Sequence, residues 1–222
     1  MPLVDHSTYK SPPFLTSGHL QTVLATLISR ARVVYERERI YTEDNDFLDL
    51  DWVRNGSTRL AVLSHGLEGD SKRGYMMGMV RALTSHGWDA LAWNARGCSG
   101  EPNRVLRFTH SGATEDLHTV IRHIVATYSY SELVLIGFSL GGNLTLKYLG
   151  ERTPDPRIKA AVTFSVPCDL QCSSNKLAMP ENRIYMRRFL MTLREKVLAL
   201  AQLMPGTIDD RVFTVTKFQG FR

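Results

Sequence analysis

The chain has 222 residues, of which 43% are hydrophobic and 22% charged, with a formal net charge of +5 and an isoelectric point near 9.2. This composition is typical of one globular domain and argues against an intrinsically disordered chain. The lysines and arginines are scattered, without a run of five or six like charges, which argues against a nucleic-acid partner.

The sequence contains no targeting or membrane-spanning segment that we can identify. Residues 1–14 lack a basic segment followed by an apolar one, so they do not resemble a secretory signal. No apolar stretch approaches the roughly 20 residues that cross a bilayer. The cysteines Cys98, Cys168 and Cys172 are odd in number and lack a second pair of zinc-ligand spacing. We therefore expect a soluble, cytoplasmic protein with reduced thiols, and we leave peripheral membrane contact open.

The amino-terminal part of the chain is predicted to form a helix, a hairpin and the first buried strand. The pattern of residues 22–53 predicts a short helix and then two alternating strands, with a turn at 43–46. Residues 59–64 form a continuous apolar run, which suits a strand buried on both faces of a parallel sheet. The helical spacing of residues 73–87 ends on Gly87, a residue type common just after a helix.

Strands and helices alternate over the next part of the chain. We expect a buried strand with a glycine-rich loop, then a helix, a strand, a helix and a strand, at 88–103, 112–130, 131–139, 140–152 and 157–167. Such alternation implies right-handed crossovers and a doubly wound, mostly parallel α/β sheet.

The pattern changes after the last of these strands. A polar loop begins at Cys168, and residues 181–204 have the spacing of one or two amphipathic helices with many basic residues. Their position suits a lid over the strand ends, and an ordinary solvated surface helix is an equal alternative. Residues 211–222 begin like another strand. Without repeats or a composition shift, we expect a single domain over 1–222 with a possible lid insertion at 168–204.

A Gly-x-Ser-x-Gly pattern centres on Ser139, between a predicted strand and a predicted helix. This is the context of a nucleophile elbow, in which Gly137 and Gly141 permit the chain to turn sharply. The amide of Leu140, at the start of the helix, then points to where an oxyanion would form. The alternative is a serine in an ordinary glycine-rich turn.

A second feature, Ser-His-Gly-Leu-Glu-Gly at 64–69, follows the first buried strand. In an open α/β sheet, sites lie outside the carboxyl ends of the strands. The amide of Leu67 could therefore face that of Leu140 and complete a two-donor oxyanion hole. We interpret His65 as a residue that shapes this loop through the backbone, because the hydrolase chain order places the catalytic base on a later loop.

Five ordered blocks carry a resemblance to the YheT-like branch of the α/β-hydrolase superfamily, a group of esterases. The blocks are HGLEGDSKRGY, WNARGCSGEPNR, THSGATEDL, GFSLGGNLTLKYLGE and SVPCDL, and the resemblance covers roughly residues 10 to 220. It implies a carboxylic ester hydrolase with a Ser-Asp-His triad, some relatives acting on acylglycerols or phospholipids. By match to the motif, Ser139 is the nucleophile. The loops after the fourth strand would border the site or serve only loop architecture, through Arg96, Ser99, Asn103 and His110.

No histidine follows the serine, although the triad order in this fold is Ser, acid, His. The seven histidines are His6, His19, His65, His86, His110, His118 and His123. The aspartates after the serine are Asp155, Asp169, Asp209 and Asp210, and we interpret Asp169 as structural. Neither the triad Asp nor the triad His is therefore expected in this chain.

Two explanations fit the expected lack of a triad Asp and His. We favour a carboxy-terminally truncated fragment of an active esterase, because the chain ends within a strand-like pattern. Its sheet would lack the last strands and expose an apolar edge. The other account is a complete but degenerate member without a triad. In either case we expect turnover to be weak or lost, because removal of a triad base costs several powers of ten.

The resulting prediction is an α/β-hydrolase fold with a helical lid after the sixth strand, acting on carboxylic esters (EC 3.1.1 type) through an acyl-enzyme on Ser139. The substrate is expected to be a small-molecule or lipid ester, and neither a metal nor an organic cofactor is implied. The alternatives are a thioesterase or acyltransferase on the same fold, or a non-catalytic hydrolase-like binding protein. The oligomeric state is left open.

Overall fold

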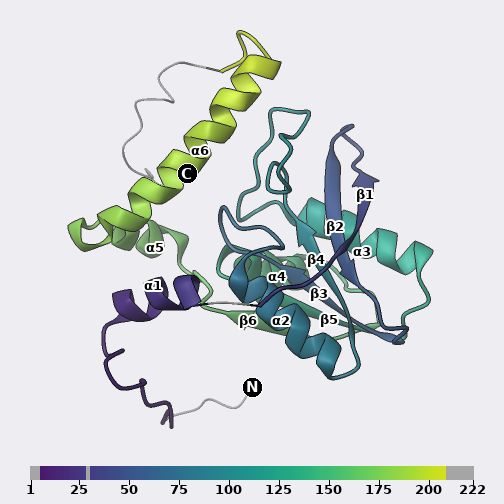
Figure 1. Cartoon of the computed structure of the whole chain (residues 1–222). Helices are drawn as coiled ribbons and strands as arrows, with labels where there is room; N and C mark the ends of the chain where they lie inside the picture. The colour runs from purple at the N-terminus through teal and green to yellow at the C-terminus, as the bar shows by residue number, and fades with distance from the viewer. Residues whose placement is uncertain (1–5, 29–30, 209–222) are drawn as a thin grey trace.

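The computed structural model describes residues 6–28 and 31–208, which form an α/β arrangement (Figure 1). The strands are β1 (Glu36–Tyr41), β2 (Phe47–Val53), β3 (Arg59–Ser64), β4 (Asp89–Asn94), β5 (Glu132–Phe138) and β6 (Ile158–Phe164). The helices are α1 (Gly18–Ile28), α2 (Gly74–Ser85), α3 (Thr114–Thr127), α4 (Leu140–Glu151), α5 (Leu170–Leu177), the 3-10 turn η1 (Pro180–Asn182) and α6 (Arg183–Leu203).

The described strands form one sheet in the order β1-β2-β4-β3-β5-β6. The hairpin β1-β2 is antiparallel, and β2 pairs antiparallel with β4. The remaining pairs, β4 with β3, β3 with β5 and β5 with β6, are parallel. The carboxyl ends of the parallel strands therefore lie at the same edge of the sheet, where a site is expected.

Side chains point alternately to the two faces of the sheet along the central strands, so the hydrophobic core has one part on each face. Leu60 and Val62 of β3 belong to a cluster with the buried faces of α3 and α4. Ala61 and Leu63 of the same strand belong to a second cluster with Met76 and Val80 of α2. Successive side chains of a strand point to opposite faces, so a continuous apolar run is the signature of a strand covered on both sides.

The sequence-based fold prediction is confirmed, including the hairpin turn between β1 and β2 and the alternation from β3 to β6. Gly87 follows α2 with a φ of +76°, as expected for the residue after a helix. One detail was wrong: the segment predicted as a polar loop from Cys168 contains the helix α5. Asp169 caps that helix, because its carboxylate accepts a hydrogen bond of 2.8 Å from the amide of Cys172. The predicted strand at 211–222 lies outside the described residues.

Helices α1, α5 and α6 lie apart from the helices that cover the sheet (Figure 1). α6 follows β6, α5 and η1, and it contacts both of the last two. Along the described sheet, β6 is an edge strand on which Val162 and Phe164 are exposed by 45% and 39%. Within residues 6–28 and 31–208, no helix is both long and apolar enough to cross a membrane.

Candidate active site

Ser139 lies at the sharp turn between β5 and α4, with its side chain exposed. Its backbone has a φ of +50° and a ψ of −116°, a conformation that residues other than glycine rarely adopt. The amide of Ser139 donates a hydrogen bond of 2.8 Å to the carbonyl oxygen of Phe164, which fastens the turn to the end of β6. Backbone strain of this kind concentrates at functional sites.

The two glycines of the pattern are required because the backbone is crowded on both sides of the serine. A Cβ atom on Gly137 would lie 2.5 Å from the Cα of Gly142. One on Gly141 would lie 2.4 Å from the carbonyl oxygens of Ser64 and His65. The first turn of α4 therefore packs directly against the end of β3, and only glycine allows the two backbones to come this close.

The loop after β3 lies directly against the serine. A Cβ atom on Gly66 would be 3.3 Å from the Cβ of Ser139. Leu67 and Leu140, the two predicted oxyanion donors, line one cavity of about 30 Å³, which has room for little more than a water molecule or a carbonyl oxygen. Within the described part of the chain, neither of their amides donates a hydrogen bond. The structure thus brings together the elements that the sequence analysis singled out.

His65 is buried and locked between two backbone groups. Its Nδ1 lies 2.7 Å from the carbonyl oxygen of Gly66, and its Nε2 accepts a hydrogen bond of 3.1 Å from the amide of Ala95. Because Nε2 is the acceptor, the proton is on Nδ1 and is donated to Gly66. Burial lowers the pKa of His65 to about 4, so the ring is neutral at pH 7. These contacts agree with a residue that shapes the loop, and they leave no nitrogen free to accept the proton of Ser139.

Tyr75 of α2 is a site residue that the sequence analysis missed. Its hydroxyl accepts a hydrogen bond of 3.1 Å from the amide of Gly66. Its ring contacts Phe138, with 4.9 Å between ring centroids, and Phe138 stacks on Phe164 at 5.0 Å. These three residues form an aromatic row beside Ser139. No local pattern reveals it, because its members come from three elements that are far apart in the sequence.

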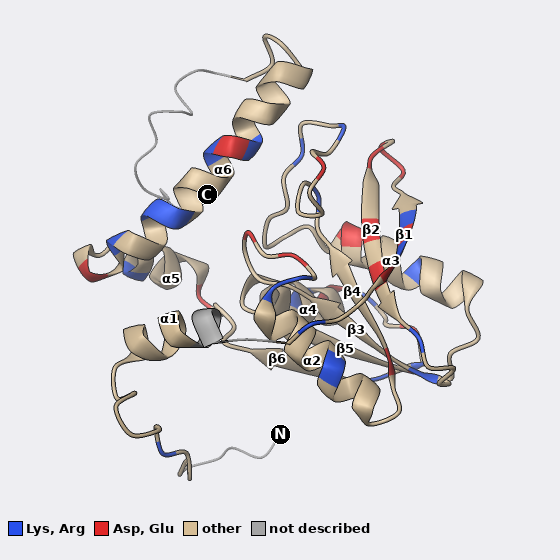
Figure 2. Ribbon diagram, viewed as in Figure 1, with Lys and Arg blue, Asp and Glu red and all other residues tan. Residues whose placement is uncertain are grey.

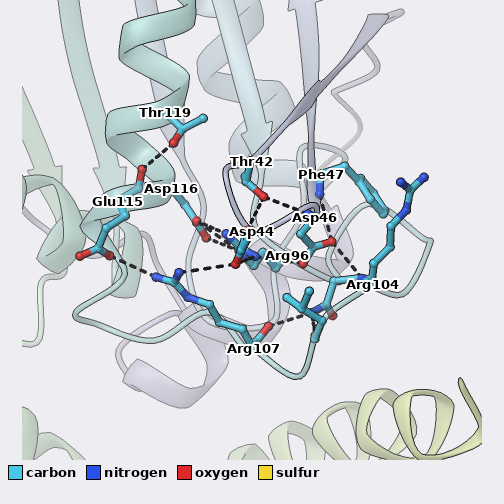
Figure 3. Close-up of polar contacts among 12 residues, drawn as sticks. Thr42, Asp44, Asp46, Phe47, Arg96, Arg104, Arg107, Glu115, Asp116 and Thr119 are labelled. Carbon is cyan, nitrogen blue, oxygen red and sulfur yellow. Dashed lines mark hydrogen bonds and ion pairs between the residues drawn. The ribbon is translucent and has the colours of Figure 1, made fainter. Parts of the chain in front are cut away.

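The loop after β4 is held by an ion-pair network around Arg96 (Figure 3). The guanidinium of Arg96 binds Asp116 of α3 in a bidentate manner and also contacts Asp44 at 2.8 Å and Asp46 at 3.0 Å. Desolvation opposes its charge, but Asp116 and Asp44 outweigh desolvation and raise the pKa of Arg96. Arg96 therefore holds the loop to the hairpin turn and to α3.

The other residues that were predicted to border the site in this region also form hydrogen bonds that hold the loops. Asn103 donates to the carbonyl oxygens of Val105 and Arg107, and the Nδ1 of His110 accepts from the amide of Gly112. Ser99 offers its carbonyl oxygen to a guanidinium of β1. Arg96 and His110 additionally line the small cavity, so they border the site as well.

Lys196 of α6 reaches the loop after β3, a contact that the sequence analysis also missed. Its Nζ lies 3.0 Å from Oε1 of Glu68 and 3.1 Å from Sγ of Cys98. Burial alone would lower the pKa of Lys196, but Cys98 and Glu68 outweigh this effect and raise it. Lys196 therefore stays protonated at neutral pH and is not suited to act as a base for Ser139.

In the part of the chain that the structure describes, neither a histidine nor a carboxylate is hydrogen-bonded to the side chain of Ser139. No hydrogen bond joins Ser139 to any of the seven histidines, all of which lie within residues 6–28 and 31–208. Asp169 caps α5, and Asp155 pairs with Arg157 at 2.9 Å. Asp209 and Asp210 lie outside the described residues. Across the same ranges, no group of three His, Cys, Asp or Glu side chains is placed to hold a metal ion.

Comparison with known proteins gives consistent matches. Residues 57–210 match the family described as serine aminopeptidase, S33. The chain is 35% identical over 196 residues to YheT, a proposed esterase of Escherichia coli (strain K12), and the match covers 86% of this chain and 57% of YheT. It is 36% identical over 205 residues to phospholipase ABHD3 of Bos taurus, covering 86% of this chain and 50% of that protein.

Solved structures show the same fold. The structure of the Pyrococcus furiosus esterase Pf2001 superimposes with a TM-score of 0.54 at 26% identity, covering 62% of this chain and 53% of the esterase. The chain thus spans about half the length of the curated relatives it matches.

Proposed function

Because this chain belongs to the serine aminopeptidase S33 family of the α/β-hydrolase superfamily, we propose that it carries the nucleophile half of a carboxylic ester hydrolase. The observation that carries this proposal is the strained Ser139 beside a small cavity lined by Leu67 and Leu140, whose backbone amides donate no hydrogen bond within the described residues. We favour esters over amides because the names of YheT, ABHD3 and Pf2001 describe esterases and a phospholipase.

The proposed reaction is acyl transfer through a serine ester. The Oγ of Ser139 attacks the ester carbonyl, and the amides of Leu67 and Leu140 stabilise the oxyanion, each contributing roughly 3 kcal/mol to the transition state. The alcohol leaves with a proton, and water then hydrolyses the acyl-enzyme. No cofactor takes part in this scheme. The proton acceptor for Ser139 and its orienting carboxylate are, in our proposal, not residues of these 222.

Neighbouring residues would hold the oxyanion loop in place. His65 binds the carbonyl oxygen of Gly66 and the amide of Ala95, and Tyr75 binds the amide of Gly66, so both backbone polar groups of the residue before Leu67 are held in place. We propose that α6, within the segment 168–204, acts as a lid in one domain with the sheet. Its Lys196 pairs with Glu68, which adjoins Leu67 in that loop.

A serine-directed fluorophosphonate probe tests the proposed nucleophile. The Oγ of Ser139 would displace fluoride from phosphorus, and the released proton needs a base. We therefore expect slow labelling of the wild-type chain, accelerated by added imidazole, and none of Ser139→Ala. A thioesterase or acyltransferase would label in the same way and would differ only in the preferred acceptor. If the folded chain is not labelled even with imidazole, the proposed nucleophile role of Ser139 is wrong. A non-catalytic binding protein is then the better interpretation.

A further inference from the structure

A second cavity, of about 390 Å³, adjoins the small one next to Ser139. It shares Leu67 and Glu68 with the small cavity. Its other walls come from α1, the first residues of α2 and the first half of α6. We call this space the α1–α6 groove. Its volume lies within the range of sites that bind small organic ligands.

Part of the α1–α6 groove is apolar. Val23 of α1 and Phe189 of α6 line it, together with the ring of Tyr75. Tyr75 also belongs to the aromatic row that runs past Ser139 through Phe138 and Phe164. A hydrocarbon chain in the groove would therefore have apolar contacts on the way from α6 to the serine.

The groove also carries a positive charge that has no counter-charge among the described residues. Figure 2 shows basic residues along α6, and one of them, Arg188, lines the groove. Arg73 lines it too, and pairs with Asp70 at 3.3 Å, while Glu68 is neutralised by Lys196. Arg188 forms no ion pair with any carboxylate of residues 6–28 and 31–208. Among the charged side chains that line the groove, Arg188 is therefore the one without an ion-pair partner in the described part of the chain.

The amino-terminal end of helix α2, next to Arg73, adds to this positive potential. The guanidinium of Arg73 donates a hydrogen bond of 2.9 Å to the carbonyl oxygen of Glu68, so its position is fixed. Helix α2 begins at Gly74 with no acidic residue in its first turn and no side-chain cap. Guanidinium groups bind phosphate and carboxylate oxygens in a bidentate manner, which suits them for recognising such anions.

We propose that the α1–α6 groove binds the anionic group of an amphiphilic ester, a phosphate or carboxylate, with Arg188 as its counter-charge. The hydrocarbon part lies along Val23, Tyr75 and Phe189. The assignment of this ligand as a substrate rests on the proposed function of Ser139. Binding of the anionic amphiphile does not require a reactive serine, so it is measured separately.

Calorimetric titration with three probes tests the groove. The probes are octyl phosphate below its micelle concentration, octanol and inorganic phosphate. We expect octyl phosphate to bind most tightly, because only it uses both the apolar wall and Arg188. Arg188→Gln should weaken the binding of octyl phosphate roughly tenfold, because the variant loses the charge-assisted hydrogen bonds to the phosphate oxygens. Arg188→Gln should leave the affinity for octanol unchanged. Arg188→Lys, which keeps the positive charge, should restore part of the affinity for octyl phosphate.

The matched control is Arg187→Gln, which changes the neighbouring exposed arginine of α6 on the side away from the groove. Octyl phosphate should bind this variant and Ser139→Ala as it binds the wild type. Equal affinity for octanol and octyl phosphate, or equal loss in Arg187→Gln and Arg188→Gln, would overturn the proposal. If inorganic phosphate binds as tightly as octyl phosphate, the proposal of an amphiphilic ligand is wrong and the site binds free phosphate. Probe labelling of Ser139 reports on the proposed function independently of all these outcomes.

Discussion

At the scale of single residues, the main finding is that Ser139 carries its exposed hydroxyl on a strained backbone. Its φ of +50° and ψ of −116° lie where glycine is favoured, and such conformations cost on the order of 1–3 kcal/mol. The surrounding contacts impose the conformation, since the amide of Ser139 is bound to Phe164 and the flanking glycines leave no room for another path.

We predict that Ser139→Gly is more stable than Ser139→Ala by about 1 kcal/mol, because glycine adopts this conformation without the steric penalty. Both variants lack the hydroxyl, so the comparison isolates the backbone. The free energy of unfolding in urea measures the difference. Equal stabilities would mean that the backbone at this turn is not strained.

The pH dependence of stability follows from His65. Its pKa is lowered to about 4 by burial, against an ordinary value of 6.5. Between these values the unfolded chain binds a proton that the folded chain does not, so this contribution to stability is complete above pH 6.5 and is lost as the pH falls toward 4. We expect a loss on the order of 3 kcal/mol.

Urea unfolding of the wild type and of His65→Asn at several pH values checks this expectation. The variant should be less stable at pH 7, because it loses the bond to the amide of Ala95. It should also lose less stability between pH 6.5 and 5 than the wild type does. Parallel pH profiles would show that His65 is not the group responsible.

At the scale of elements, α6 contributes side chains to both cavities. Phe189 lines the α1–α6 groove, and Leu193 and Lys196 line the small cavity. On the same helix Ile184 and Met191 are exposed by 79% and 52%. One face of α6 is thus turned to the site and another to solvent, which is the arrangement that the proposed lid requires.

Replacing Phe189 and Leu193 by serine should reduce the preference for long acyl chains, because both side chains would contact a chain bound next to Ser139. The measurement compares labelling rates with short-chain and long-chain alkyl fluorophosphonates. The control is Ile184→Ser with Met191→Ser, which changes exposed positions of the same helix. If the chain-length preference is the same in both double variants, α6 is a scaffold helix and not a lid.

At the scale of the whole molecule, Arg96 joins parts of the chain that are distant in sequence. It links Asp44 and Asp46 of the hairpin turn to Asp116 of α3, and it stands in the loop that borders the site (Figure 3). The side chains of Arg96, Asp46 and Asp116 are at most 3% exposed. A buried arginine of this kind is needed mainly because its carboxylates cannot be left unpaired.

Arg96→Met should lower the free energy of unfolding by roughly 3–5 kcal/mol, because it leaves buried carboxylates without a counter-charge. Arg122→Met is the control. Arg122 pairs with Glu43 at 2.9 Å, but both side chains are more than half exposed, so we expect a change of about 0–1 kcal/mol. Chemical denaturation measures both variants. Similar losses in the two would show that the Arg96 network does not hold the fold together.

The order and type of the elements as far as β6, and the tight turn at Ser139 between a strand and a helix, could be predicted from the sequence because they depend on near neighbours. The apolar run of β3 indicated a strand covered on both faces, and the glycines around Ser139 indicated a turn too tight for side chains. The loop-shaping interpretation of His65 could be reached as well, since it depended on the position of this residue after its strand.

Only the tertiary structure decided which residues meet at the site. Lys196 and Glu68 are 128 positions apart. Tyr75 of α2 meets Phe138 at the end of β5, and Phe138 in turn stacks on Phe164 at the end of β6. The α1–α6 groove, with Arg188 in its wall, is formed by helices that are distant in the sequence. The periodicity of apolar residues and the spacing of glycines in a sequence reflect the local burial and the local steric constraints of each residue. The partners of a side chain across such distances are fixed by how the layers pack, so the sequence pattern alone does not reveal them.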